Sequence, residues 1–580
     1  MGDMRTSDLL LLAAVLVPLA LALASVKPWV RRRADVLLLL APLPGLAAAL
    51  LVPVGQSVLV VPPPFRLTFA LDLPGAVLLG GAALLWLAAG LYAVSYLRAD
   101  PARGTFSVWW LLTLAGSFAV FLVADVASFY LAYALVSFSA FGLATHDDTA
   151  EARRAGKVYL ALTVLGEALL IAAFVMLASS ATEANPLIRD AVAGLSASPW
   201  KETILALLLV GFTMKMGLFP LHVWMPLAHA VAPVPGSAVL SGIVVKAGVI
   251  GLIRFLPGGE AWLDWGTGLM AAGLFTAYYG VAIGLTQRHP KRVLAYSTVS
   301  QMGVVAAVLG AGLERGDAAV PALAAFYALS HMLLKGAMFL TVGVAAATPR
   351  ARLAPVLLVA ALLGLSLAGL PFTGGALAKY AVKDPVGEGL AGVLLALSAV
   401  GTTVLMARYV LLLLDVAGAK GEGAKGEEAK GEGAKRETEA AAGTGFAGLP
   451  VAPGEGLPWA VLSGLAVLLP FVLFTPVTGG SLAILLSLST LIKGLWPVAL
   501  GLGVAALIYQ KPPRFVELPP GDIIVAVAPL AAAYRALRDG AVALDTVLRR
   551  WSTAALALVM LVLVLAYVMA EAVFPPGLVP

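Results

Sequence analysis

The sequence has no cysteine, only five histidines, and few charged residues, which make up 12% of its 580 positions. The absence of cysteine excludes disulfide bonds, iron–sulfur ligation and thiolate metal sites within this chain. The scarcity of charge excludes ordinary soluble domains, in which about a quarter of the residues are charged. Because 61% of the residues are hydrophobic, the chain is predicted to lie in a lipid bilayer, and its net charge of +6 does not indicate a nucleic-acid partner.

Windows of about 20 apolar residues predict transmembrane helices. They indicate an all-α polytopic membrane protein with about 16 spans, the first of them a retained helix. The predicted spans are 8–26, 36–54, 73–97, 105–123, 126–145, 158–180, 203–230, 236–256, 266–286, 292–312, 319–346, 354–378, 386–414, 457–477, 483–509 and 553–574.

The placement of basic residues predicts the orientation of the chain. Most of the 38 lysines and arginines fall in alternate loops, including 27–35, 98–103, 288–292 and 350–352. Short loops rich in lysine and arginine mark the cytoplasmic side. We therefore expect a multi-pass protein of the inner (cytoplasmic) membrane with both termini on the outer side.

The spans and loops predict seven regions. They are three N-terminal helices with an external hairpin near 56–73 (1–104), a first inverted repeat (105–256), a second inverted repeat (257–415), a disordered cytoplasmic linker of AKGE-type repeats (416–456), helices 14 and 15 (457–509), an interfacial lateral helix (510–552) and a terminal span (553–580). The linker is predicted to be disordered because its repeats hold no apolar side chain larger than alanine. A loop with a short helical turn is the alternative for the lateral helix.

Five charged residues fall well inside predicted spans. They are Lys215, Lys246, Lys335, Lys379 and Glu167. A charge at the bilayer centre costs about 2.5–3.5 kcal/mol on insertion scales, so such residues indicate either function or a paired structural role. Lys493 is expected to lie at the interface instead, with its amine extended toward water.

Three of the five histidines, His222, His229 and His331, also fall in apolar segments. Zinc binding is a poor explanation for them because carboxylates are sparse nearby and the lysines would repel a cation. No metal or cofactor is expected. One hypothesis is that these residues are structural polar groups with satisfied hydrogen bonds. The other is that a row of lysines, histidines and one glutamate, bridged by water, passes protons along.

Proline interrupts two of the predicted spans. Pro220 lies within span seven, and Pro371 precedes Gly374 and Gly375 in span twelve. Discontinuous helices at corresponding positions of two halves indicate an ion pathway and internal repeats. Because the breaks lie five spans apart, we predict two five-helix repeats.

Four stretches carry a resemblance to a known family: 215-KMGLFPLHVWMPLAHAVAPVPGSAVLSGIVVKAGVIGLIRF-255, 287-QRHPKRVLAYSTVSQMG-303, 331-HMLLKGAMFLTVG-343 and 369-GLPFTGGALAKY-380. Together they resemble the antiporter-like subunits of respiratory complex I, Mrp cation/proton antiporters and energy-converting hydrogenases, over residues 105–415. The resemblance implies fourteen core helices with inverted repeats, a lateral helix, and a midplane chain that moves protons. The residues on that chain would be Lys215, Lys246, Lys335, Lys379, His222, His229 and His331.

One position departs from the family pattern. The resemblance implies a glutamate in span five that faces the span-seven lysine, and Ala134 occupies that position here. Glu167 in span six is the nearest acid within the membrane. Our hypothesis is that Glu167 pairs with Lys215 instead. The alternatives are that Glu167 satisfies another polar group, or that the first half-channel has lost pumping.

These observations leave several functions open. The leading one is a proton-translocating subunit of a multi-subunit membrane complex, with other membrane subunits, lipid, and protons or Na⁺ as partners. The alternatives are a structural or coupling subunit of a hydrogenase or inorganic-carbon-uptake assembly, a Na⁺/H⁺ antiporter subunit, and a stand-alone transporter of an organic solute. No redox motif is visible in the chain, so any oxidoreductase chemistry would belong to its partners.

Overall fold

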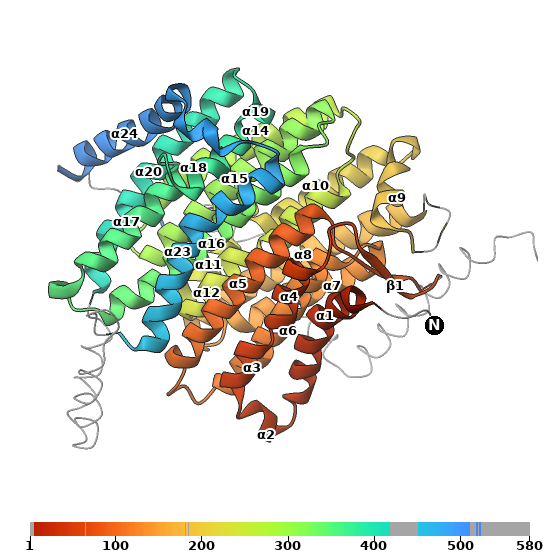
Figure 1. The fold of residues 1–580 in the computed structure, drawn as a ribbon, viewed down its shortest axis with the longest axis horizontal. Coiled ribbons are helices and arrows are strands. Elements are labelled where there is room, and N and C mark those ends of the chain that lie inside the picture. The colour runs from red at the N-terminus through yellow and green to blue at the C-terminus, as the bar shows by residue number, and fades with distance from the viewer. Residues whose placement is uncertain are drawn as a thin grey trace, which may run out of the picture.

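The computed structural model describes residues 5–63, 65–179, 181, 183, 185–417, 451–510, 518, 519, 521 and 523. Most of the expected linker, the expected lateral helix and the expected last span therefore lie outside the described residues. Helices arranged as a bundle make up most of the rest (Figure 1), so the prediction of an all-α polytopic protein is confirmed.

The first half of the bundle begins with α1 (Thr6–Ala24), α2 (Pro28–Arg31), α3 (Ala34–Leu40), α4 (Leu43–Leu51), β1 (Ser57–Val61), β2 (Leu67–Ala70), α5 (Leu73–Tyr96), α6 (Arg103–Leu122), α7 (Val126–Ala144) and α8 (Ala150–Ser179). It continues with α9 (Ile188–Ala193), η1 (Leu195–Ala197), α10 (Lys201–Met216), α11 (Trp224–Val231), α12 (Val234–Val239), the π-helical segment η2 (Leu240–Val244) and α13 (Lys246–Phe255).

The second half contains α14 (Leu263–Thr286), α15 (Pro290–Arg315), α16 (Val320–Ala347), η3 (Arg350–Arg352), α17 (Ala354–Ala368), α18 (Gly374–Ala381), α19 (Lys383–Val386) and α20 (Leu390–Val416). After the linker come α23 (Pro453–Thr478), η5 (Leu482–Leu486) and α24 (Leu488–Gln510).

Within the described residues, 13 helices are long and apolar enough to cross a membrane. Two further predicted spans, 203–230 and 354–378, are each divided into two shorter helices, α10–α11 and α17–α18. Helices cross a bilayer because only a helix or a closed barrel satisfies its own backbone hydrogen bonds in lipid. An interrupted span therefore has to lie where protein or water can satisfy the freed backbone groups.

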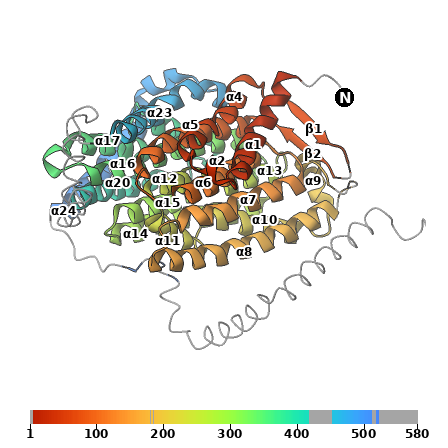
Figure 2. The same ribbon diagram turned by 90° about the horizontal axis from the view of Figure 1, so that it is seen from below.

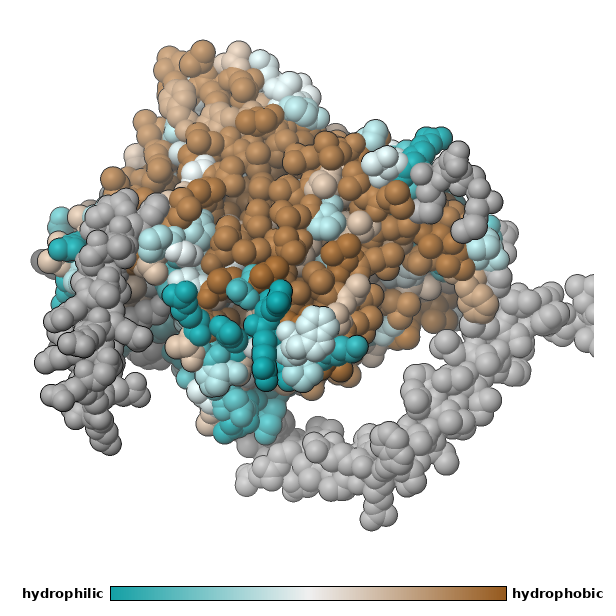
Figure 3. Space-filling view, turned by 60° about the horizontal axis from the view of Figure 1, so that its bottom comes forward, coloured by the Kyte–Doolittle hydropathy of each residue, from teal (hydrophilic) through white to brown (hydrophobic). Residues whose placement is uncertain are grey.

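Burial separates the inner helices from the outer ones. In the apolar 18-residue windows of α15 and α16 every residue is buried by protein, whereas in the corresponding window of α24 only 22% of the residues are buried. The outer helices expose leucine, valine and phenylalanine, which form a broad hydrophobic surface with hydrophilic side chains gathered along its rim (Figure 3). That surface suits contact with lipid, whereas enclosed helices such as α15 and α16 can hold polar groups away from lipid.

The antiparallel pair β1–β2 confirms the hairpin expected near 56–73. It marks one end of the bundle, called here the hairpin end, where α8, α13 and α15 finish. The opposite end, called the arginine end, carries the basic loops around Arg32, Arg153 and Arg350. The long helices run between these two ends (Figures 1 and 2).

Arg254 joins three elements at the hairpin end. Its guanidinium donates to both carboxylate oxygens of Asp72, at 3.0 and 3.1 Å, and to the carbonyl oxygens of Val120, Phe121 and Val123 at 2.7–3.0 Å. Asp72 is also the N-cap of α5, where it accepts a hydrogen bond from the Gly75 amide. The planar guanidinium thus satisfies carbonyl groups left open at the C-terminal end of α6 while neutralising the cap of α5.

Candidate functional site

The two interrupted spans end their first halves in the same way. Gly217 follows α10 with φ 77°, and Gly369 follows α17 with φ 97°. Glycine adopts this left-handed conformation without the strain that a Cβ atom would cause, so it ends a helix cleanly. Pro220 and Pro371 lie in the turns that follow, where a proline ring cannot continue the helix.

Each break places a lysine inside the bundle. Lys215 belongs to the last turn of α10, two residues before Gly217. Lys379 lies on α18, and its side chain runs across the break, because a Cβ atom on Gly369 would come within 2.8 Å of the Lys379 Cδ. Glycine is therefore required at 369 for its backbone conformation and also for the space that the lysine occupies.

The Lys215 amine lies among side chains from α7 and α8. Its Nζ donates to the Ser137 Oγ at 2.9 Å and to the Tyr159 hydroxyl at 3.4 Å. Ser137 also contacts the Glu167 carboxylate, and Glu167 and Lys215 line one cavity of about 20 Å³. A cavity of that size holds about one water molecule. One Glu167 oxygen has no hydrogen-bond partner among the described residues, so a single water in the cavity would complete the contact between acid and amine.

Ala134 lies half-buried on α7, one turn before Ser137. Positions three apart share a helix face, so Ser137 follows on the face where the family pattern implies a glutamate. At this site the structure has a neutral hydroxyl group from α7 and a carboxylate from α8. The hypothesis that Glu167 serves Lys215 stays a prediction, and Ser137 lies between the two groups.

Lys246 and His331 are in direct contact at the centre of the bundle. The Lys246 Nζ lies 2.7 Å from the His331 Nδ1 and 3.1 Å from the carbonyl oxygen of Ser241 in η2. Lys335, one turn after His331 on α16, donates to the Leu294 carbonyl on α15 at 3.0 Å. Both lysines are fully buried. The Lys246–His331 contact is the shortest link between any two of the residues predicted from the sequence.

The histidines of the α10–α11 segment lie apart from this pair. His222 is in the turn, with its ring 4.9 Å from that of Tyr279 on α14. His229 lies on α11, and its ring is 5.6 Å from Phe339 on α16. Both nitrogens of His229 are buried without a protein hydrogen bond in the described part of the chain. An imidazole in this position needs water to satisfy it.

Lys379 connects two cavities. A small one of about 10 Å³, lined also by His331, Ser330 and Tyr327, lies on its inner side. A much larger one of about 360 Å³ lies on its other side, among α18, α19, α20 and α24. Lys246 therefore contacts His331 directly, and the small cavity lies between His331 and Lys379. The large cavity was not predicted from the sequence, because its walls come from segments far apart in the chain.

Buried charged residues that were not predicted as site residues include Lys291 and Glu455. Lys291, interpreted as a loop residue, lies in the first turn of α15 and donates to the Ala232 carbonyl at 2.6 Å. Glu455 is buried in the first turn of α23 beside Tyr92. Both positions adjoin polar loops in the sequence, so hydropathy places them outside the spans. Only the packing of neighbouring helices reveals their burial.

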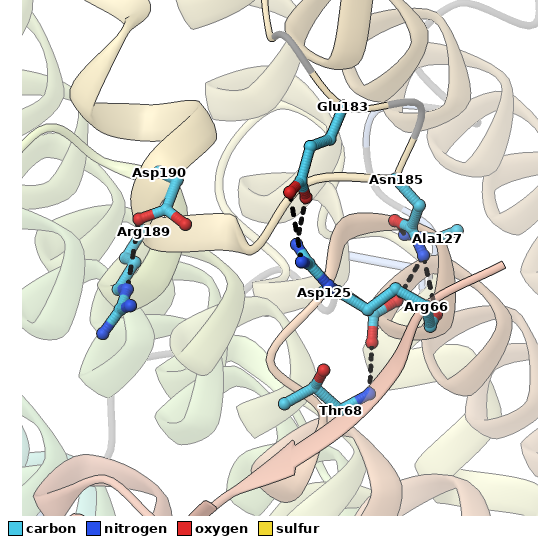
Figure 4. Close-up of polar contacts among 8 residues, drawn as sticks. All are labelled: Arg66, Thr68, Asp125, Ala127, Glu183, Asn185, Arg189 and Asp190. Carbon is cyan, nitrogen blue, oxygen red and sulfur yellow. Dashed lines mark hydrogen bonds and ion pairs between the residues drawn. The ribbon is translucent and has the colours of Figure 1, made fainter. Parts of the chain in front are cut away.

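A polar cluster closes the hairpin end beside α7 and α8 (Figure 4). The buried Asp125 caps α7 and accepts hydrogen bonds from the Thr68 amide at 2.9 Å, the Ser128 amide at 2.9 Å and the Asn185 side chain at 2.8 Å. Arg66 pairs with Glu183 next to it. The loop before α9 is thereby attached to β2 and to the start of α7.

Comparison with known proteins gives the family context. Residues 123–405 match the family model described as NADH:quinone oxidoreductase/Mrp antiporter, TM. The chain is 30% identical over 300 residues to hydrogenase-4 component B of Escherichia coli, a match covering 48% of this chain and 44% of that one. It is 33% identical over 267 residues to Na(+)/H(+) antiporter subunit A1 of Staphylococcus saprophyticus, covering 44% of this chain and 33% of that one. The matches thus span less than half the length of these relatives.

Two solved structures share the fold. One, from the Mrp complex of Dietzia sp. DQ12-45-1b, superposes with a TM-score of 0.68 at 22% identity, over 99% of this chain and 64% of that chain. The other, from the archaeal membrane-bound sulfane sulfur reductase, gives a TM-score of 0.64 at 18% identity, over 87% of this chain and 99% of that chain. The matched segment is thus similar to antiporter-like membrane subunits, and the fold is shared with both solved structures.

Proposed function

We propose that this chain, an antiporter-like membrane subunit by its match over residues 123–405, moves protons as one subunit of a multi-subunit membrane complex. The carriers would be Lys215, Lys246, Lys335, Lys379, Glu167, His222, His229 and His331, with Pro220 and Pro371 at the helix breaks. The arrangement that supports this most is the Lys246–His331 contact followed by the small cavity to Lys379. Lysine and imidazole both bind and release protons, and Lys246 and His331 are already within hydrogen-bond distance.

The finer architecture belongs to the same proposal. The chain would have sixteen spans, inverted repeats at 105–256 and 257–415, an N-terminal region at 1–104, a linker at 416–456, helices 14 and 15 at 457–509, a lateral helix at 510–552 and a terminal span at 553–580. The arginine end would face the cytoplasm in the inner membrane, because it holds the basic loops. The two breaks, each with a left-handed glycine and a proline, support the repeats.

The deciding experiment substitutes the two lysines at the breaks. In the assembled complex, Lys215→Ala and Lys379→Ala should each reduce ion translocation to near background while the other subunits still co-purify. Arg189→Ala is a suitable control, since that exposed side chain lies far from both cavities. Translocation at the normal rate by both lysine variants, in intact complexes, would rule out the carrier role.

Ala134 supports a second candidate, a structural or coupling subunit with an impaired first half-channel, as in a hydrogenase-type or carbon-uptake assembly. An alanine cannot influence the protonation of Lys215 as a carboxylate does. The two candidates differ in one observable property. A coupling subunit would tolerate Lys215→Ala while still losing activity when its contacts with partners are disrupted.

The transported ion is the remaining question, since one relative is a Na(+)/H(+) antiporter subunit A1. Sodium prefers clustered oxygen ligands, as other hard cations do. The carriers named above comprise four lysines, three histidines and one carboxylate. This composition favours protons, and the dependence of translocation on external Na⁺ in vesicles would test the choice.

A further inference from the structure

The large cavity beside Lys379 is walled partly by α24, which lies beyond the segment that matches the family model. Gly494 on α24 packs against the break itself, because a Cβ atom there would lie 3.3 Å from the Pro371 ring. The cavity has a volume of about 360 Å³ and reaches Ser398, the third turn of α20, about 12 Å below the start of that helix. It therefore extends well into the bundle from the hairpin end.

Charged side chains occupy the mouth of this cavity. Lys383 and Asp384 come from α19, Glu388 from the following loop and Lys493 from α24. The Lys493 Nζ lies 3.5 Å from a Glu388 carboxylate oxygen, and both side chains are largely exposed, at 53% and 86%. An exposed ion pair of this kind contributes little to stability, so it separates readily and does not seal the opening.

The lining as a whole carries an excess of positive charge. Together with the buried Lys379 it has three lysines, and only two carboxylates oppose them. A cleft with low-dielectric walls concentrates the field of such charges and changes the local concentration of ions of each sign. Water and anions should enter this cavity more readily than a metal cation does.

We propose that α24 forms the outer wall of an aqueous vestibule beside Lys379, and that the positive charge of Lys493 disfavours the entry of cations at the mouth of this vestibule. The inference rests on the proposed function only in treating Lys379 as a group that exchanges protons with this side. A vestibule that disfavours Na⁺ yet admits water would let Lys379 exchange protons and would help to explain proton selectivity. Lys493 is then a specificity-determining residue that acts without touching Lys379.

The absence of cysteine makes the proposal directly testable. Ser398→Cys is nearly isosteric and introduces the only thiol of the chain at the inner part of the vestibule. In vesicles that contain the whole complex, the hairpin side would be treated with methanethiosulfonate reagents carrying either a sulfonate or a trimethylammonium group. Ala197→Cys, on an exposed turn at the same end, supplies the reference rate for each reagent.

Ser398→Cys should react from the hairpin side, and the anionic reagent should be favoured relative to the reference thiol. Adding Lys493→Glu should lower the anionic-to-cationic rate ratio about tenfold, because two units of charge change at the mouth. Arg189→Glu makes the same charge change at a remote exposed position of this end and should leave the ratio unaltered.

Two results would overturn the inference. One is a Ser398 thiol that stays unmodified while the Ala197 thiol reacts, since the cavity would then not be connected to water. The other is an unchanged ratio with Lys493→Glu. Labelling does not depend on translocation, so a shifted ratio in a protein whose Lys379→Ala variant still translocates would refute the proposed function and retain the vestibule.

Discussion

The surroundings of Lys215 and Lys379 differ although both lysines lie at helix breaks of similar form. Lys215 is enclosed by α7, α8 and α10, where Ser137 and Tyr159 accept hydrogen bonds from its amine and the cavity has room for about one water. Lys379 borders a cavity of about 360 Å³ that reaches charged, exposed side chains. In Figure 1, α18, α20 and α24 lie on the left of the bundle, and α7, α8 and α10 lie to the right of them.

The hairpin end shows the same contrast. Beside α7 and α8 it is closed by the Asp125 cluster, which ties the loop before α9 to β2. Beside α18 it is open between α20 and α24. A closed site with a carboxylate suits a lysine that holds or passes on charge within the protein. An open site suits a lysine that exchanges protons with water. Repeated local structure therefore does not imply equivalent function.

The largest expected effect comes from opening the closed end. Asp125→Ala removes the acceptor of three hydrogen bonds and leaves the buried Thr68 amide and the half-buried Ser128 amide unpaired, so it should lower the free energy of unfolding by about 3 kcal/mol. Thermal unfolding of the purified complex would measure this. Asp190→Ala, which removes an exposed carboxylate nearby, should change stability by less than about 1 kcal/mol. Equal effects of the two substitutions would show that the cluster does not close this end.

A smaller effect is expected at the carboxylate of the closed site. Glu167→Gln should slow translocation about tenfold, equivalent to 1.4 kcal/mol, because Lys215 loses the charge that stabilises its protonated form. Ala134→Glu in the same chain should restore much of the rate, since it returns a carboxylate to the same face of α7 one turn from Ser137.

Glu455→Gln provides the matched control, a buried glutamate on α23 beside Tyr92. Glu455→Gln should leave the rate of translocation unchanged, because it does not alter the surroundings of Lys215. Failure of Ala134→Glu to rescue a slow but assembled Glu167→Gln complex would mean that Glu167 acts on a group other than Lys215.

A weaker effect is expected from the hydroxyl group that separates acid and amine. Ser137→Ala removes one hydrogen bond to Lys215, worth about 1 kcal/mol, so translocation should fall severalfold. Ser398→Ala removes a hydroxyl that bonds only its own helix near the open site, and its rate should stay within a factor of about two. Proton flux in reconstituted vesicles compares the two, and a larger loss with Ser398→Ala would reverse the assignment of closed and open sites.

The last prediction concerns pH and tests whether acid lowers the stability of the protein itself, apart from any effect on the lysine sites. His289 precedes α15, where its Nδ1 accepts from the Lys291 amide, and burial lowers its pKa to about 4. An unfolded histidine has a pKa near 6.5, so the unfolded state binds more protons and stability is lost as pH falls from about 6.5 toward 4. His289→Asn should flatten this part of the stability profile, measured by unfolding between pH 7 and 5. An unchanged slope would place the acid sensitivity elsewhere.

Much of this molecule could be predicted from local sequence. Apolar windows located the spans because a helix that crosses lipid needs about 20 apolar residues. Glycine and proline located the breaks because glycine readily adopts the left-handed conformation that ends a helix and proline cannot continue the helix. The use of such windows also explains why Lys291 and Glu455 were missed. A window ends where a polar loop begins, so a charged residue at its edge is assigned to the loop and is expected to be exposed to water. The hairpin at 56–73 was found because β-branched residues alternate around three prolines.

The sequence by itself determined that the chain spans a membrane, where its helices break, and which ionisable groups lie within apolar segments, since each of these depends on residues close together in the chain. Only the tertiary structure decided that Glu167 reaches Lys215 through Ser137, that Lys246 contacts His331, and that α24 and α20 leave a cavity beside Lys379. These relations join side chains from different helices. Their geometry depends on how the helices pack, which no local pattern of residues specifies.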